Sequence, residues 1–163
     1  MSNIIVVYYS AQDHTRSIAR QIAQNLGADF YELRPTKKYS EEDLDWADAT
    51  SRVNLEHQGE LSRDIELDRA VPLEWDKYDT VIVGYPIWWG DAAWPINGFI
   101  KAADFTGKKV YTFCTSYSSP EGGSAADLRS LANGGDWQEP KRFFQSTKAI
   151  DIAEWTDKIK SEL

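Results

Sequence analysis

The 163-residue chain carries 26 acidic and 18 basic side chains, which give it a net charge of −8. A chain of this length is one ordinary domain that buries roughly two thirds of its unfolded surface, so it needs no disulfide or structural metal to fold. The charge argues against a nucleic-acid partner, which would need a basic patch. Cys114 is the only cysteine, which excludes an intrachain disulfide and a four-thiolate zinc site.

The N-terminal residues and the apolar runs predict a cytoplasmic protein that does not bind membranes. Residues 1–9 lack the basic flank, the long apolar core and the small-residue cleavage site of a signal peptide, and residues 4–9 read as a strand. No apolar run approaches the roughly 18 residues that are needed to span a bilayer. We therefore expect a soluble chain.

The start of the chain predicts a strand, a helix and a second strand. Residues 4–9 are β-branched and aromatic without polar alternation, which is typical of a strand covered on both faces. Apolar side chains then recur at helical spacing over residues 18–26, and Gly27 is well placed to end that helix. Residues 29–33 read as the second strand, which Pro35 closes.

The same alternation returns after residue 78. Residues 79–85 predict a buried strand, which is followed by a loop and by a helix over residues 96–103. Residues 109–115 predict a further strand, and the spacing of Ser124 and Asp127 predicts a capping box that opens a helix through residue 131. A weak strand near residues 137–143 precedes a last helix over residues 152–163.

About five alternations of strand and helix predict one α/β domain over residues 1–163. Such a chain forms a doubly wound parallel sheet with right-handed crossovers and helices on both faces. Ligands of these sheets bind at the carboxyl ends of the strands, at the topological switch point. The loops that follow the first, third and fourth predicted strands are therefore the candidate site.

Residues 35–74 interrupt the alternation and are called the insertion from here on. They hold eleven acidic and five basic side chains, and so account for six of the eight net negative charges. A solvated face is the more frequent explanation of such a run, and a surface that steers basic redox partners is the alternative. We expect short helices near residues 41–46 and 48–58, with Trp46 and Leu55 packed on the body.

The loop after the first strand, residues 10–15, is a candidate phosphate site. It has hydroxyl side chains at both ends and opens a helix, whose free N–H groups and dipole favour an anion. The chain has no glycine-rich motif for a dinucleotide or a nucleoside triphosphate. Taken alone, a hydroxyl-rich turn of this kind is more often only a helix cap.

Two further loops carry aromatic and hydroxyl residues. Residues 85–90 place Trp88 and Trp89 side by side after a buried strand, where neighbouring side chains point to opposite sides, so that one of them is available to stack on a planar ligand. The alternative is that both close the bottom of a cleft. Residues 115–124 are small and hydroxylic, which lets backbone N–H groups reach the edge of a ligand.

Together the three loops resemble those of the flavodoxin family, specifically short bacterial members with a tryptophan-rich second loop. The resemblance rests on residues 7–15, 84–90, 113–116 and 141–143, and the string Tyr-Pro-Ile-Trp-Trp-Gly at 85–90 is its most specific part. It implies a flavodoxin-like five-stranded sheet of order 2-1-3-4-5 and a bound flavin mononucleotide (FMN).

The resemblance also implies which residues hold the FMN. The phosphate would contact four residues of the first loop: Ser10, Gln12, His14 and Thr15. The isoalloxazine ring would lie between two sets of residues: Pro86, Ile87, Trp88, Trp89 and Gly90 on one side, and Thr115, Ser116, Tyr117 and Gly123 on the other.

Two positions depart from the family pattern. Asp13 brings a carboxylate near the phosphate, and at ~8 Å the repulsion is about 2 kcal/mol per unit charge before screening. His14 and Arg16 are candidates to offset it. Tyr117 stands where relatives often have glycine, and its ring either stacks on the flavin or blocks the site.

The remaining polar residues predict no further chemistry. We expect Cys114 to be a buried, inert thiol and His57 to be a surface residue. No Ser/His/Asp arrangement, metal-spaced cluster or carboxylate pair stands out, so no catalytic residue is predicted.

Three functional hypotheses follow. The first is an FMN electron carrier that exchanges electrons with a redox partner protein or a small-molecule acceptor. The second is an NAD(P)H-dependent quinone reductase, and the third is a binding module that has lost the flavin. The sequence allows either a monomer or a homodimer.

Overall fold

The computed structural model describes residues 3–116, 123–144 and 146–163. Its strands are β1 (Ile4–Tyr8), β2 (Asp29–Glu32), β3 (Thr80–Trp88), β4 (Asp91–Ala92), β5 (Lys109–Ser116), β6 (Asp136–Trp137) and β7 (Lys141–Phe144). Its helices are α1 (His14–Leu26), α2 (Arg52–Gln58), α3 (Ile96–Ala102), α4 (Ser124–Leu131) and α5 (Ala149–Ser161), with a 3-10 turn η1 at Trp75–Lys77. None of the helices in these ranges is both long and apolar enough to cross a membrane.

The strands form a parallel sheet of order β2-β1-β3-β5-β6, and β7 also pairs with β5 in parallel. The predicted fifth strand at 137–143 is thus two short strands, β6 and β7, one after the other along β5. Pro140 lies between them and has no N–H to donate to the ladder, which explains the break. The predicted doubly wound sheet of order 2-1-3-4-5 is confirmed with its fifth strand divided.

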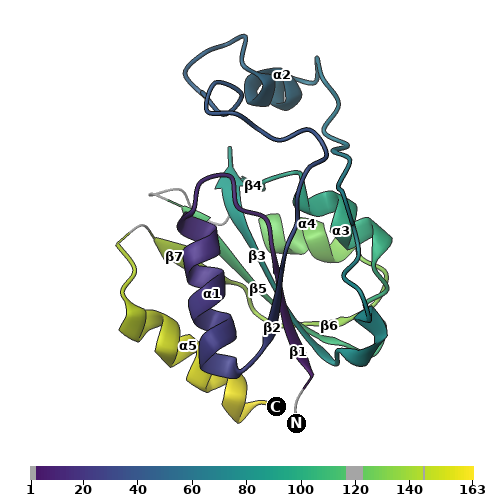
Figure 1. The fold of residues 1–163 in the computed structure, drawn as a ribbon, viewed down its shortest axis with the longest axis vertical. Helices are drawn as coiled ribbons and strands as arrows, with labels where there is room; N and C mark the ends of the chain where they lie inside the picture. Colours follow the sequence, from purple (N-terminus) through teal and green to yellow (C-terminus); the bar gives the residue numbers. More distant parts are fainter. Residues whose placement is uncertain (1–2, 117–122, 145) are drawn as a thin grey trace.

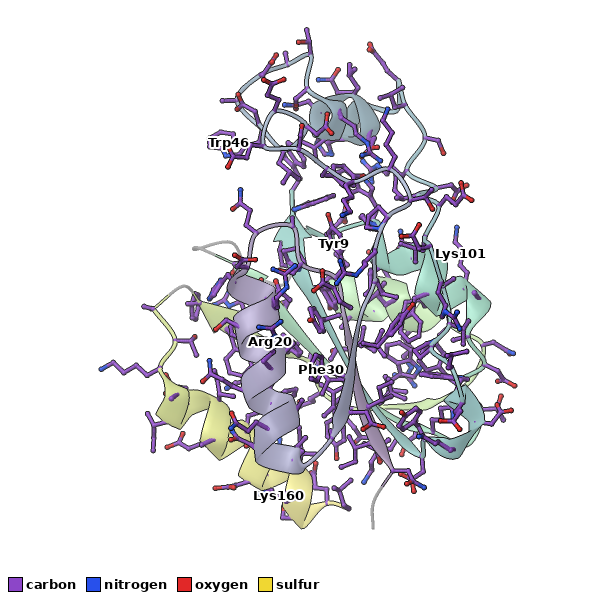
Figure 2. The ribbon with its side chains drawn as sticks, viewed as in Figure 1. Tyr9, Arg20, Phe30, Trp46, Lys101 and Lys160 are labelled. Carbon is purple, nitrogen blue, oxygen red and sulfur yellow. The ribbon has the colours of Figure 1, made fainter. Side chains whose placement is uncertain are left out.

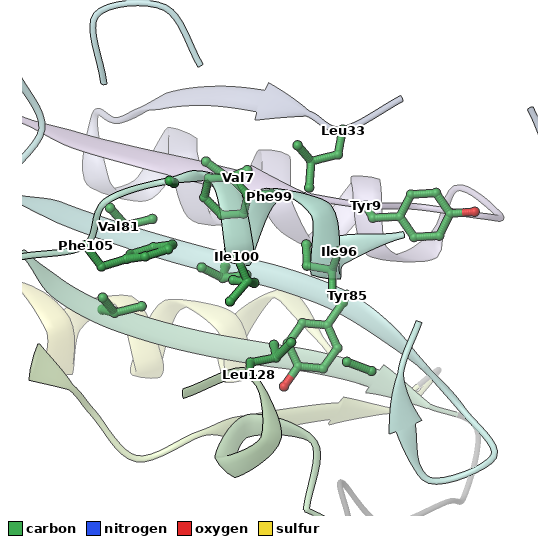
Figure 3. Packing of buried hydrophobic residues seen from close by; sticks show 14 of the residues in the cluster. Val7, Tyr9, Leu33, Val81, Tyr85, Ile96, Phe99, Ile100, Phe105 and Leu128 are labelled. Atoms are coloured by element: carbon green, nitrogen blue, oxygen red, sulfur yellow. The ribbon is translucent and has the colours of Figure 1, made fainter. Parts of the chain in front are cut away.

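Helices cover both faces of the sheet. Helices α1 and α5 lie on one face, while α3 and α4 lie on the other (Figure 1). Every residue of β1 is buried, because alternate side chains enter the two cores. Figure 3 shows the core under α3 and α4, where Val7, Val81 and Ile100 pack together.

One helix start agrees with the sequence prediction and another differs from it in its cap. Helix α1 begins at His14, within the loop expected to open it, and ends at Gly27 with φ 61°, as predicted. The capping box at Ser124 is wrong, because Gly123 is the N-cap of α4 and no side chain caps that helix. Ser124 is buried instead, and its hydroxyl lies 3.2 Å from the hydroxyl of Tyr85.

The predicted strand at 79–85 continues to Trp88, so residues 86–88 are strand rather than loop. Trp88 pairs with Asp91 of β4 in an antiparallel hairpin. The two residues of its turn, Trp89 and Gly90, both have positive φ, 49° and 80°, as a type I′ turn requires. We call residues 86–92 the tryptophan hairpin.

The part of the insertion around α2 lies beyond the carboxyl ends of the strands, and its later residues run back past β2 and α3 (Figure 1). The helix expected at 41–46 is absent and the one expected at 48–58 is shortened to α2, because Asp side chains accept hydrogen bonds from nearby backbone N–H groups and form turns instead. Asp45 accepts from Ala47 at 3.1 Å and Asp48 from Thr50 at 2.9 Å. Trp46 does not pack on the body: it is 74% exposed and projects outward (Figure 2).

Gly84→Ala should destabilise the protein by about 1–3 kcal/mol, because the Phe113 ring of the neighbouring strand lies 2.1 Å from where the new methyl would be. Urea unfolding followed by circular dichroism measures the change. Gly98→Ala is a matched control, because its methyl meets the movable end of Leu67 at 3.1 Å and the Ile65 carbonyl oxygen at an ordinary contact distance of 3.5 Å. Unchanged stability of Gly84→Ala would contradict the close packing of β3 against β5, and adding Phe113→Leu should recover part of the loss.

Candidate functional site

The three strands that the predicted loops follow end at one edge of the sheet. Because β3 pairs in parallel with both β1 and β5, the carboxyl ends of all three strands lie side by side. Two hydrogen bonds join the segments there. The Tyr9 N–H donates to the Gly84 carbonyl at 3.0 Å, and the Thr15 and Thr115 hydroxyls lie 2.8 Å apart. The sheet therefore brings together residues that are up to 100 positions apart in the chain.

The first loop presents unpartnered N–H groups at the start of α1. Asp13 is the N-cap, but its side chain makes no capping hydrogen bond. The Ser10 hydroxyl accepts from the N–H of Arg16 at 3.2 Å. The N–H groups of Gln12, Asp13 and Thr15 make no hydrogen bond to another described residue. A row of such groups at a helix N-terminus is a site for an anion.

The predicted phosphate contacts differ in exposure. Gln12 is exposed, whereas Ser10 and His14 are half-buried. Thr15 is buried at 2% exposure, and its hydroxyl is already paired with that of Thr115. A hydroxyl has one proton and two lone pairs, so the pair leaves one of the two hydroxyls free to donate to a ligand.

Arg16 neutralises part of the negative charge beside this loop. Its guanidinium binds both carboxylate oxygens of Glu32, at 2.7 and 2.8 Å, and also pairs with Asp13. The hydrogen bond from Arg16 lowers the pKa of Glu32, which stays charged. One arginine thus serves two carboxylates, and the Asp13 charge near the first loop is offset only in part.

In the tryptophan hairpin, the indole of Trp88 is held by three other rings. Tyr9, Tyr39 and Trp94 meet it edge to face, with ring centroids 5.8, 5.5 and 4.8 Å away. The three come from the end of β1, from the insertion and from the segment after β4. Trp88 is half-buried as a result, and its orientation depends on the insertion.

Trp89 points elsewhere and is 41% exposed. Its indole stacks on the ring of His57, with centroids 4.2 Å apart and planes 6° apart. The prediction that His57 is a surface residue is wrong: it is half-buried, and its carbonyl accepts a hydrogen bond from Arg63 at 2.8 Å. The stack arises because the insertion returns α2 to the hairpin, which no local pattern around His57 could indicate.

The other predicted ring contacts lie along the ends of β3 and β5 and at the start of α4. Pro86, Ile87 and Gly90 are half-buried, Thr115 and Ser116 are buried, and Gly123 is exposed. Tyr117 lies outside the described residues. Cys114 is buried, as predicted.

Sequence reasoning found no role for Glu56, a buried acidic side chain of the insertion. It is 2% exposed and accepts hydrogen bonds from Tyr39 at 2.6 Å, Trp94 at 2.9 Å and Arg52 at 3.0 Å. Burial, followed by the bond to Glu56, raises the pKa of the Tyr39 hydroxyl, which therefore remains a donor. The four-residue spacing of Arg52 and Glu56 was the only local signal of this cluster.

Comparison with known proteins identifies the family. The flavodoxin family profile matches residues 3–159. A presumed flavoprotein from Bacteroides eggerthii is 32% identical, with a TM-score of 0.84 over 98% of this chain and 99% of that one. Another, from Bacteroides uniformis, is 33% identical, with a TM-score of 0.85 over 96% and 98%.

More distant solved structures show the same fold. A flavoprotein from Lactobacillus acidophilus, crystallised in complex with FMN, is 23% identical, with a TM-score of 0.66 over 87% of this chain and 93% of that one. No protein with a curated description matches the chain. Since the family profile spans nearly the whole sequence and the sheet has the doubly wound order, the chain belongs to the flavodoxin family.

Proposed function

We propose that this protein binds FMN at the edge formed by the carboxyl ends of β1, β3 and β5 and serves as an electron carrier. The observation that carries the proposal is the meeting of two unlike surfaces at that edge. One is the row of unpartnered N–H groups at the start of α1, and the other is the aromatic tryptophan hairpin. An anionic group on a planar aromatic ring is the ligand that both surfaces together would suit.

The residues present fit the two ends of FMN. The hydroxyls of Ser10 and Thr15 and the N–H groups of residues 12, 13 and 15 would hold the phosphate. The tryptophan hairpin would face one side of the isoalloxazine ring, with Thr115 and Ser116 near the other. When bound, FMN supplies the ability to take up and release electrons, and the protein positions it and excludes water. The flavoprotein from Lactobacillus acidophilus in complex with FMN supports this choice of flavin.

The partners and the location follow from the proposal. Electrons would pass to a redox partner protein or a small-molecule acceptor, in the cytoplasm. The acidic surroundings would disfavour an anionic reduced flavin and so lower its potential. An NAD(P)H-dependent quinone reductase would use the same site with room for a second ring, and the experiments below separate the two.

FMN should bind ~100-fold or more tightly than riboflavin, because each charge-assisted hydrogen bond to the phosphate contributes about 1.5–3 kcal/mol. Isothermal titration calorimetry with each flavin measures the ratio. Ser10→Ala should reduce it by about tenfold. Ser17→Ala is the control, because Ser17 lies on α1 beyond the first loop, and it should leave the affinity ratio unchanged. Equal affinities for the two flavins would contradict phosphate binding at the first loop, and no heat with either would indicate a module without flavin.

Asp13→Asn should tighten FMN binding while leaving riboflavin binding unchanged, because only FMN brings a second negative charge to that carboxylate. The Asp13 side chain is 89% exposed and paired with Arg16, so we expect a gain of about three- to tenfold rather than the full unscreened repulsion. The same calorimetric titrations measure it. A variant with the wild-type FMN affinity would show that Arg16 cancels the charge.

An electron carrier should keep its oxidised flavin spectrum when the FMN-loaded protein is mixed anaerobically with NADH or NADPH. Stopped-flow absorbance in the flavin band follows the reaction, and dithionite serves as the positive control for reduction. Rapid bleaching by either nucleotide would contradict the carrier and favour the reductase. The protein reduced by dithionite should then return to the oxidised spectrum when a quinone or ferricyanide is added.

A further inference from the structure

We infer that Glu56 of the insertion is a positioning residue for the flavin site, where it fixes the indole of Trp88 through Tyr39 and Trp94. The inference rests on the proposed function, because it concerns the tryptophan hairpin that would face the ring. It gives the insertion a role in the site. The charged groups of Glu56 and Arg52 would act through these rings, without contacting the flavin themselves.

The carboxylate of Glu56 is buried, and both of its oxygens accept hydrogen bonds. Only 2% of the residue is exposed. One oxygen, Oε1, accepts from both the Tyr39 hydroxyl at 2.6 Å and the Trp94 indole N–H at 2.9 Å. The other, Oε2, accepts from Nε of Arg52 at 3.0 Å. A buried carboxylate is stable only when it is paired and hydrogen-bonded in this way, so each donor is held in a narrow range of positions.

The two donors on Oε1 are the rings that hold Trp88 from the side of the insertion. Tyr39 and Trp94 meet that indole at 67° and 75°, while Tyr9 meets it at 88° from the end of β1. Two of the three rings around Trp88 therefore donate hydrogen bonds to the same oxygen atom, Oε1 of Glu56. A change at that atom would move both rings, and the indole that they enclose would move with them.

Arg52 anchors the carboxylate to the backbone. Its Nη1 donates to the carbonyls of Lys37 at 2.8 Å and Lys38 at 3.2 Å, and its guanidinium lies 3.7 Å from the centre of the Tyr39 ring. Both side chains of this ion pair are largely buried, with 11% of the Arg52 side chain and 3% of the Glu56 side chain exposed. The start of the insertion, α2 and Trp94, which packs on Trp88 of the tryptophan hairpin, are therefore joined at one ion pair.

Only a carboxylate fits all three donors. A glutamine at position 56 has the same shape, but one of its two polar atoms is an NH₂ group that cannot accept. That group would face either Arg52 or the Tyr39 and Trp94 donors, so one contact becomes a repulsion between donors. Glu56→Gln is thus a near-isosteric change aimed at the orientation of Trp88. Tyr39→Phe is a milder one, because it removes one donor and keeps the ring.

The first experiment uses the flavin-free protein labelled with ¹⁵N, whose seven tryptophans each give an indole N–H signal in the NMR spectrum. Loss of a signal in Trp88→Phe and in Trp94→Phe assigns the two of interest. Glu56→Gln and Tyr39→Phe should shift or broaden the Trp88 signal, whereas Glu60→Gln, an exposed carboxylate just after α2, should not. A Trp88 signal that stays in place in both variants would overturn the inference, whether or not FMN binds.

The second experiment is a double-mutant cycle on FMN affinity, measured with the wild type, Glu56→Gln, Trp88→Ala and the double variant. Glu56→Gln should weaken binding by about tenfold in the wild type and by less than about twofold when Trp88 is already alanine. Equal losses in both backgrounds, or no loss in the wild type, would refute a role through Trp88. Lack of FMN binding by the wild type would instead reject the proposed function, and the indole signals would still test Glu56.

Discussion

The candidate site depends on the parallel pairing of β3 with both β1 and β5. Parallel strands end at the same edge of a sheet, so the segments that follow them meet although long crossovers separate them in the chain. Gly84 makes this pairing close in the middle of the sheet, because the Phe113 ring occupies the space that a side chain would fill. With the sheet in register, the Thr15 and Thr115 hydroxyls come within hydrogen-bonding distance, and the start of α1 faces the end of β5.

The insertion adds contacts to the site that the sheet alone would not provide. Its middle part lies beyond the carboxyl ends of the strands and brings α2 to the tryptophan hairpin, where His57 stacks on Trp89 (Figure 1). Glu56 of the same helix binds Trp94, just after the hairpin. A buried ion pair of this kind contributes little net stability, because the loss of solvation offsets most of the attraction. Its value lies in geometry, since each partner accepts few arrangements. The turns at residues 41–50 carry the exposed Trp46 and four exposed acidic side chains, whereas the face toward the hairpin is aromatic and buried.

At the first loop, groups that attract an anion are partly cancelled by a group that repels it. Unpartnered N–H groups and the helix dipole attract an anion, while the exposed Asp13 carboxylate repels it. Arg16 is shared between Asp13 and Glu32, so it cannot turn fully to a ligand without leaving one of them unpaired. The charge at the start of α1 is therefore set by a competition among Asp13, Arg16 and, from β2, Glu32.

The sequence by itself determined the strands, the helices and their order. Burial on one or two faces imposes a periodic spacing on the apolar residues, and this spacing can be read locally along the chain. The sequence also located the three loops of the candidate site, the end of α1 at Gly27 and the burial of Cys114. Pro140 divided the last strand and Asp side chains converted an expected helix into turns, both through local chemistry that apolar periodicity does not register. Only the tertiary structure decided that Ser124 bonds Tyr85 instead of capping α4. His57 stacks on Trp89, and Glu56 binds Tyr39 and Trp94, which are 17 and 38 residues away; such contacts leave no periodic trace in the chain.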